Sequence, residues 1–287
     1  MNAETVGRAV PFVKMSGAGN DFVVIDHRIA VFAEPEKGAL ARRVCRRRLG
    51  VGADGLILVE PPPRGSDADY AMRYFNSDGS EGELCGNGTR CAAVFAEEIG
   101  AAGRRQAFTT PAGVIRARIV EPLLRSGGSA VVRVAMVRPG PTERLSVADL
   151  PGGPADLFAL RVGVPHAIEV VPDVRSVDVA GRGSAIRRHR AFPAGANANF
   201  IAFDADRGEI HLRTFERGVE EESLACGTGA TAAATVARRH FGWPPVVPVR
   251  MESGDRILMD LGADRPRMEG PVTRVYEGRL DLPPELP

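Results

Sequence analysis

Two cysteines of this sequence, Cys85 and Cys226, stand in closely similar surroundings. Cys85 follows the strand-like run that ends at Phe75 by ten residues, and Cys226 follows Phe215 by eleven, with mostly acidic and small residues between. Each cysteine is followed by Gly-X-Gly and then by an alanine-rich helical run. This repetition indicates an internal duplication, and two such units facing each other would bring both thiols to one cleft.

A cysteine directly before Gly-X-Gly at the start of a helix meets unpaired backbone amides and the positive end of the helix dipole. That setting lowers a thiol pKa from about 8.5 toward neutrality, and the same amides can bind a carboxylate. Inversion of an α-carbon needs a base on one face and an acid on the other. One thiolate and one thiol can supply both without a cofactor. The pattern therefore predicts a cofactor-independent amino-acid racemase or epimerase.

The other two cysteines, Cys45 and Cys91, are interpreted as buried packing residues within helices. Four scattered cysteines in 287 residues do not form the framework of a secreted disulfide-rich domain, so reduced thiols are expected. The sequence contains no CxxC, HExxH or paired-histidine spacing, so neither a zinc site nor a redox dithiol is predicted. A thiol redox protein that cycles through a Cys85–Cys226 disulfide remains an alternative of another class.

Composition excludes several other functions. A net charge of +1 gives no basic excess for a nucleic acid, and no long apolar run predicts a membrane span or export signal. A cytoplasmic protein is therefore expected. Lys14, in a strand-like run, and Lys37, opening a helix interpreted as solvent-facing, are the only lysines. Neither is well placed for pyridoxal phosphate chemistry. The GxGxxG match at 50–55 lies between a helix and a strand, the reverse of a dinucleotide-binding turn.

Hydrophobic periodicity predicts an α+β chain whose second half repeats the order of the first. A loop is expected from Arg138 to Pro154, and a tight turn is expected within 16–20. The expected strands are 9–13, 21–26, 55–60, 70–75, 159–164, 166–171, 199–204 and 209–215, and the expected helices are 36–49, 87–100 and 227–240.

With these motifs in place, the sequence resembles the diaminopimelate epimerases. The resemblance rests on KMSGAGNDF at 14–22, FNSDGSEGELCGNGTRC at 75–91, FERG at 215–218 and LACGTGA at 224–230. Pro165-His166, the segment around Asn197 and the closing run GPVTRVYEG at 270–278 add to it. The matches cover essentially the whole chain, and the two cysteine motifs together are highly specific.

The resemblance implies two pseudo-symmetric α/β domains, each a mixed sheet or barrel curled around a central helix, with the active site between them. On this basis residues 1–135 plus 270–287 form the domain of Cys85, and 136–269 form the domain of Cys226. It further implies interconversion of LL- and meso-diaminopimelate by a two-cysteine, two-base mechanism without cofactor or metal, in lysine and peptidoglycan precursor biosynthesis. A homodimer is suggested by the family.

The resemblance also assigns roles to individual residues. Cys85 and Cys226 are the acid and base, and His166 and Glu216 tune their pKa values. The residues that it places on the substrate are Asn20, Asn76, Gly86, Asn87, Asn197, Glu216, Arg217, Gly227 and Thr228. The Glu216-Arg217 pair suits the second zwitterionic head of diaminopimelate, because a bidentate arginine is a strong and selective carboxylate contact.

Three departures from the family concern the distal half of the substrate. Val164 stands where many members have Asn, Gly55 stands where some have Gln, and the segment between Arg217 and Cys226 is one residue longer than the common form. Alternatives within the fold are therefore a racemase of proline, hydroxyproline or histidine, or a phenazine-type isomerase. A non-catalytic amino-acid binding protein is a third class, but it leaves two thiols unexplained.

Overall fold

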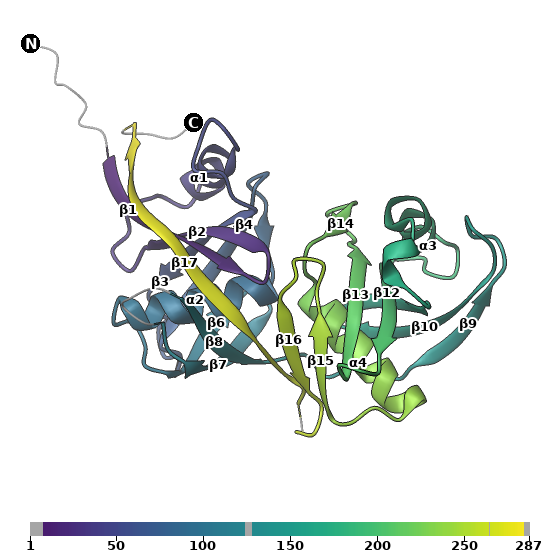
Figure 1. The fold of residues 1–287 in the computed structure, drawn as a ribbon. Coiled ribbons are helices and arrows are strands. Elements are labelled where there is room, and N and C mark those ends of the chain that lie inside the picture. The colour runs from purple at the N-terminus through teal and green to yellow at the C-terminus, as the bar shows by residue number, and fades with distance from the viewer. Residues whose placement is uncertain (1–7, 124–127, 264, 284–287) are drawn as a thin grey trace, which may run out of the picture. The chain divides into compact units, whose positions relative to one another are not determined.

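The computed structural model describes residues 8–123, 128–263 and 265–283 (Figure 1). The chain divides into two compact units, which are Met1–Val134 with Pro271–Pro287 (unit 1) and Ala135–Gly270 (unit 2). Strand β17 (Arg267–Leu282) begins in unit 2 and ends in unit 1. No helix among the described residues is long and apolar enough to span a membrane.

Unit 1 is a mixed sheet around the alanine-rich helix α2 (Gly86–Glu98), with a second helix, α1 (Glu36–Cys45), against β3 and β4. Its strands are β1 (Arg8–Gly17), β2 (Asn20–Asp26), β3 (Gly55–Glu60), β4 (Tyr70–Asn76), β5 (Glu81–Gly82), β6 (Arg105–Thr110), β7 (Gly113–Glu121) and β8 (Ser129–Ala135). Pairing runs β17-β1-β2-β3-β4-β6-β7-β8 and returns to β17, with β2–β3 and β4–β6 parallel. Helix α2 contacts β1, β2, β3, β4 and β7 and lies within this ring of strands (Figure 1).

Unit 2 repeats this pairing order around helix α4 (Gly227–Phe241). Its strands are β9 (Glu143–Val147), β10 (Ala155–Val162), β11 (Val164–Val170), β12 (Asn197–Asp204), β13 (Glu209–Phe215), β14 (Glu222–Ser223), β15 (Val246–Arg250) and β16 (Arg256–Asp260). They pair as β9-β10-β11-β12-β13-β15-β16-β17, with β11–β12 and β13–β15 parallel. Three short helical segments, η1 (Val174–Ser176), η2 (Val179–Gly183) and α3 (Ser184–Arg187), lie before β12.

The registers make the two units comparable residue by residue. In unit 1, Leu56 pairs with Val23 and with Phe75; in unit 2, Ala198 pairs with Ala167 and with Phe215. The next positions then correspond as well, so that Phe22 matches His166 and Ile57 matches Asn199. Both helices begin at the cysteine that follows the Phe75 or Phe215 strand.

The central helices are buried because their sequences allow it. Ala92, Ala93 and Ala96 of α2 and Ala232, Ala233, Ala234 and Ala237 of α4 are fully buried, and small side chains let surrounding strands approach closely. Helix α4 ends at Gly242, whose φ of 70° forms a left-handed cap. The turn between β1 and β2 has φ of 56° at Ala18 and 93° at Gly19, which is the backbone of a tight hairpin.

The predicted fold of two similar units, each with a curled mixed sheet around one helix, is confirmed. Several local predictions are wrong. The first helix ends at Cys45 rather than at residue 49, and Leu49 is 74% exposed. Gly50 returns against the last helical turn, where an added Cβ would lie 2.4 Å from the Arg43 carbonyl oxygen. Periodicity in a single segment cannot detect such a contact.

Two further interpretations need correction. The expected loop at 138–154 contains strand β9, which pairs with β10 although its own sequence, ERLSV, is largely polar. Lys37 is not solvent-facing: it is buried, and its Nζ lies 2.7 Å from carboxylates of both Glu34 and Glu60. A lysine enters a protein interior when carboxylates from other elements compensate its charge.

Candidate active site

The two cysteine turns have the same geometry. Cys85 is the N-cap of α2, with φ −123° and ψ 113°, and Cys226 is the N-cap of α4, with φ −127° and ψ 107°. In each, the sulfur accepts a hydrogen bond from the amide of the third helical residue, at 3.4 Å from Gly88 N and 3.3 Å from Gly229 N. Amide donation and the helix dipole both favour a negatively charged sulfur.

The glycine at this third position leaves room for the sulfur. A Cβ on Gly229 would lie 3.2 Å from Cys226 Sγ and 2.5 Å from Asn199 Oδ1. A Cβ on Gly88 would lie 3.3 Å from Cys85 Cβ and 3.2 Å from Ile57 Cδ1. In unit 2 the second glycine of Cys-Gly-X-Gly therefore leaves room for the sulfur, and in unit 1 it leaves room for the Cβ of the cysteine and for Ile57.

Cys45 and Cys91 lie in a different environment. Both are buried among apolar side chains, and burial raises the pKa of each thiol to about 12. A thiol with such a pKa is almost entirely protonated at neutral pH, so it is a poor base and a poor nucleophile. The predicted packing role of these two cysteines is confirmed.

In unit 1 the structure brings two of the predicted asparagines together. Asn87 Nδ2 donates to Asn20 Oδ1 at 2.6 Å, and Asn20 Nδ2 donates to Asp54 Oδ2 at 3.0 Å. Arg90, fully buried in α2, donates to Asn87 Oδ1 at 2.9 Å. Sequence reasoning missed Asp54 and Arg90. The signal for Arg90 was a charged residue inside an alanine-rich helix.

Asn76 lies at the end of β4 and bonds within its own hairpin. Its Nδ2 donates to Ser80 Oγ at 3.0 Å, and its Oδ1 accepts from the hydroxyl of Tyr74 at 2.8 Å. Tyr74 also fills the space beside Gly55, where an added Cβ would lie 2.4 Å from the Tyr74 ring. A larger residue at position 55 is therefore sterically excluded while Tyr74 keeps this position. Tyr74 is a third residue that sequence reasoning missed.

In unit 2 the predicted polar residues gather around the start of β12 and the end of β13. Asn197 Oδ1 accepts from the backbone amide of Arg217 at 2.7 Å, and the Arg217 guanidinium donates to the Ala194 carbonyl at 3.1 Å. Burial raises the pKa of the adjacent Glu216 carboxyl. Thr228 Oγ1 lies 3.5 Å from Cys226 Sγ.

His166 is fully buried on β11 and pairs in register with Asn197 of β12. The pKa of His166 is lowered to about 3, mainly by burial; the hydrogen bond with Asn199 opposes this shift, and the positive charge of Arg217 adds to it. The ring is therefore neutral throughout the physiological range. Asn199, which holds this ring, was also missed; the signal was a second polar residue two positions after Asn197 in an otherwise apolar strand.

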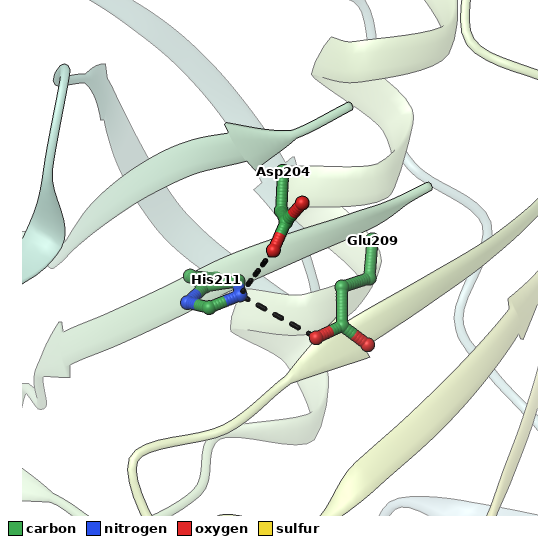
Figure 2. Close-up of side chains that lie close together, drawn as sticks. All are labelled: Asp204, Glu209 and His211. Atoms are coloured by element: carbon green, nitrogen blue, oxygen red, sulfur yellow. Dashed lines mark ion pairs between the residues drawn. The ribbon is translucent and has the colours of Figure 1, made fainter. Parts of the chain in front are cut away.

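A separate cluster lies near the end of β12 and the start of β13 (Figure 2). His211 Nε2 lies 3.6 Å from Asp204 Oδ2 and 3.4 Å from Glu209 Oε1, a set of donors that could hold a cation. Glu209, however, already bonds Arg250 through both oxygens at 3.2 Å, and Arg256 and Arg207 lie 3.3 Å and 2.9 Å from the two carboxylates. Three guanidinium groups oppose a dication, so the cluster is interpreted as an ion-pair network.

Comparison with solved structures defines the class of protein. A probable proline racemase from Agrobacterium radiobacter K84 superposes with a TM-score of 0.71 at 19% identity, covering 97% of this chain and 94% of that one. A phenazine biosynthesis protein from Enterococcus faecalis gives 0.71 at 16% identity, covering 96% and 100%. At these identities the likeness concerns the fold alone. The fold is the one shared by these proteins and the diaminopimelate epimerases.

Sequence comparison then gives the family. The family model for diaminopimelate epimerase matches residues 12–136 and 158–275. Diaminopimelate epimerases of Aquifex aeolicus and Methanocella arvoryzae are 42% and 37% identical over 281 and 284 residues, covering 94% and 95% of this chain and 97% of each relative. The chain belongs to the diaminopimelate epimerase family. It is an isomerase of lysine biosynthesis, and its activity is the epimerisation of diaminopimelate.

Proposed function

We propose that Cys85 and Cys226 are the two acid–base groups of this epimerase. The thiolate of one removes the α-proton, and the thiol of the other delivers a proton to the opposite face of the same carbon. The observation that supports this proposal is the repeated N-cap geometry, in which each sulfur accepts an amide hydrogen bond at the start of a central helix. The roles of the two cysteines exchange with the direction of the reaction.

We further propose that units 1 and 2 act as the two epimerase domains, with residues 1–135 plus 270–287 supplying Cys85 and 136–269 supplying Cys226. The backbone amides at Gly86-Asn87 and Gly227-Thr228 bind the reacting α-carboxylate, because helix N-termini bind anions. Asn20, Asn76 and Asn197 orient the head groups through amide hydrogen bonds. Asn20 and Asn197 are already held by neighbouring groups, which reduces the entropy lost on binding.

The distal zwitterionic head of diaminopimelate is assigned to Glu216 and Arg217. A guanidinium group such as that of Arg217 can bind a carboxylate through two nitrogens. Glu216 and His166 influence the cysteine chemistry through charge and hydrogen bonding, since one has a raised and the other a lowered pKa. The proposal includes action on both LL- and meso-diaminopimelate in the cytoplasm.

Solvent deuterium uptake tests the mechanism. The enzyme is incubated in D₂O with LL- or with meso-diaminopimelate, and the label at the reacting α-carbon is measured by NMR or mass spectrometry before equilibrium. A two-base mechanism places deuterium in the newly formed isomer while recovered substrate stays largely unlabelled. Equal early labelling of substrate and product would indicate a single base. Proline, hydroxyproline and histidine serve as comparison substrates.

A homodimer is proposed for the enzyme in solution on the basis of its family alone. Light scattering coupled to size-exclusion chromatography tests it directly. A mass near twice the 30.6 kDa of the chain is expected. A mass near that of one chain would contradict the proposal without affecting the assignment of the cysteines.

A further inference from the structure

Asn199 is a buried polar side chain on β12 whose amide orientation is determined by its neighbours. It is 1% exposed. Its Oδ1 accepts from the Thr214 hydroxyl at 3.0 Å, and its Nδ2 lies 3.1 Å from the Ala167 carbonyl oxygen and 2.9 Å from that of Asn197. Backbone carbonyls can only accept, so the atom facing them must be the nitrogen.

The same nitrogen lies 3.2 Å from Nδ1 of His166. This nitrogen has two hydrogens and three acceptors within reach, the two carbonyl oxygens and Nδ1, so one hydrogen is shared between acceptors. An amide nitrogen cannot accept a hydrogen bond, so a proton on Nδ1 would face another donor, and the contact favours a lone pair on Nδ1. In a neutral imidazole the single ring proton then belongs to Nε2. The tautomer of His166 therefore follows from the contacts of Asn199.

The opposite edge of the ring has a distinct environment. His166 is fully buried, and within the described part of the chain its Nε2 has no hydrogen-bond partner. A buried N–H group without an acceptor is costly, and such groups are found where an acceptor arrives with a ligand. In an epimerase of an α-amino acid, the anionic acceptors available are a substrate carboxylate oxygen and the thiolate.

Asn199 also contacts the turn that carries Cys226. A Cβ on Gly229 would lie 2.5 Å from Asn199 Oδ1, and the Gly229 amide is the group that donates to Cys226 Sγ. One amide side chain therefore touches both the ring and the cysteine turn. The matching positions in unit 1 are Ile57 and Phe22, which are apolar, so the arrangement belongs to unit 2 alone.

We propose that Asn199 is a positioning residue that fixes His166 as the Nε2-protonated neutral tautomer, so that the ring presents an N–H donor to an anionic acceptor in the reaction. This inference rests on the proposed role of His166 beside the cysteine pair. As the α-proton leaves, negative charge grows on the substrate carboxylate, and a fixed donor stabilises it. A ring lone pair in the same place would repel that charge. The ring neither gains nor loses a proton in this role.

Nitrogen-15 NMR of the histidine rings tests the tautomer without any assay of activity. The chain has five histidines, and the His166 signals are assigned by their loss in His166→Gln. In the unmodified enzyme at neutral pH, His166 is expected to show a protonated Nε2 and an unprotonated Nδ1. A protonated Nδ1, alone or in an imidazolium, would overturn the proposal.

Asn199→Asp places a carboxylate acceptor beside Nδ1 and should transfer the ring proton to that nitrogen or give an imidazolium. Turnover, kcat, should fall about 10²-fold, the lower end of the range for loss of a positioned polar group in catalysis. An unchanged Nε2 tautomer in this variant would contradict the inference. Should Asn199→Asp fail to fold, Asn199→Leu, which only removes the donor, should give a mixture of tautomers; a pure Nε2 tautomer there would count against it equally.

Thr214→Val is the matched control. It removes the hydroxyl that donates to Asn199 Oδ1 but leaves the Asn199–His166 contact, so the wild-type tautomer is expected. The two proposals fail separately. Full turnover by Cys226→Ala would refute the two-cysteine mechanism while the tautomer result stands, and a protonated Nδ1 would refute the tautomer while leaving the cysteines assigned.

Discussion

The two cysteine turns share one backbone design but rest on different supports. In unit 1, the residues beneath and beside the turn are Ile57 and a chain of hydrogen bonds from Arg90 through Asn87 and Asn20. In unit 2, the corresponding support is Asn199 with the neutral ring of His166. The repeated feature is the N-cap position of each cysteine, where a backbone amide donates a hydrogen bond to the sulfur. The features that differ are the side chains that pack against each turn, which are apolar Ile57 in unit 1 and polar Asn199 in unit 2.

This difference explains why a duplicated unit need not give two equivalent halves. The cysteine turn that both units share requires only a strand, a cysteine and Gly-X-Gly at the start of a helix. A short stretch of sequence encodes all of these, so a duplication can preserve them. The support beneath the turn differs between the units, because it depends on the side chain at one position of the neighbouring strand, β3 in unit 1 and β12 in unit 2. One substitution there, such as Ile57 against Asn199, changes an apolar support into a polar one without disturbing the fold.

The largest expected effect concerns the shared element. Cys85→Ala and Cys226→Ala should each lower kcat by about 10³-fold or more, because each removes one proton-transfer group of an obligatory pair. Rates in both reaction directions, measured by circular dichroism or coupled assay, test this expectation. Thermal unfolding should show both variants folded. A variant that keeps near-normal turnover in either direction would show that its cysteine is not one of the pair.

Selective alkylation sharpens the comparison among the four thiols. Cys45 and Cys91, with pKa values raised to about 12 by burial, should react at least about a thousandfold more slowly near pH 8 than a thiol of ordinary pKa. Cys85 is partly exposed and should be labelled first by iodoacetamide, followed by Cys226, which is 5% exposed. Peptide mass spectrometry over time gives the order. Early labelling of Cys45 or Cys91 would contradict it.

Arg217 is another residue in which the two units differ. The matching position in unit 1 is Ser77. Arg217→Ala should raise KM for diaminopimelate by roughly one to two orders of magnitude, because a charged hydrogen-bonded contact is lost. The effect on kcat should be smaller. Arg213→Ala, on the strand β13 that precedes the Arg217 turn, is the control, because that arginine bonds Glu222 rather than the proposed site. Equal KM changes in the two variants would remove the assignment.

The paired glycines offer a smaller and more direct test of the two supports. Gly229→Ala should destabilise the fold by about 1–3 kcal/mol, because its Cβ would overlap Asn199 Oδ1 within a packed core. Gly88→Ala should cost less, about 1 kcal/mol or below, since its Cβ has no contact under 3.2 Å, two of its three nearest atoms are the flexible ends of Ile57 and Met72, and alanine favours the helix. Urea unfolding of both variants measures the difference. A larger cost at Gly88 would reverse the comparison.

The dependence of stability on acid pH should differ between the units, because unit 1 contains the half-buried carboxylate Glu60. Burial alone would raise the pKa of Glu60, but hydrogen bonds from His27 and Lys37 outweigh it and lower the pKa to about 2. The contribution of ionised Glu60 to the free energy of unfolding is present above about pH 4.5 and is lost as the pH falls toward 2. The reason is that the Glu60 carboxyl of the unfolded chain binds a proton at a higher pH than that of the folded protein. Glu60→Gln should remove on the order of 2 kcal/mol of stability at pH 7 and flatten this dependence.

The control for Glu60 is Glu34→Gln. Glu34 also pairs with Lys37, but its side chain is 64% exposed, so water screens the interaction and a loss below about 1 kcal/mol is expected. The position in unit 2 that matches Glu60 is Ala202, which has no charge to titrate. An equal loss for the two glutamate variants would show that burial is not what makes Glu60 matter.

The sequence alone was sufficient to predict the elements with strong local signals. The buried strands around Val23, Leu56 and Phe200 and the two alanine-rich helices were expected within a few residues of their observed bounds. Strands β6 to β9, β15 and β16 were not predicted; β6 and β9 are short and largely polar, and charged residues interrupt the apolar runs of β7, β8 and β16. Lys37 was misjudged because its partner Glu60 lies on another element.

For the site, the motif Cys-Gly-X-Gly by itself determined the identity of the two thiols and their place at helix starts, because capping is a property of four consecutive residues. The residues that orient the groups around them, Asn199, Asp54, Arg90 and Tyr74, were decided only by the tertiary structure. Asn199 contacts a ring on the neighbouring strand, Asp54 accepts from Asn20 of another element, and Tyr74 fills the space beside Gly55 of β3, whereas Arg90 reaches Asn87 within its own helix and is notable for its complete burial. Which buried donor meets which acceptor depends on strand register, and register is a property of the folded sheet rather than of any segment read alone.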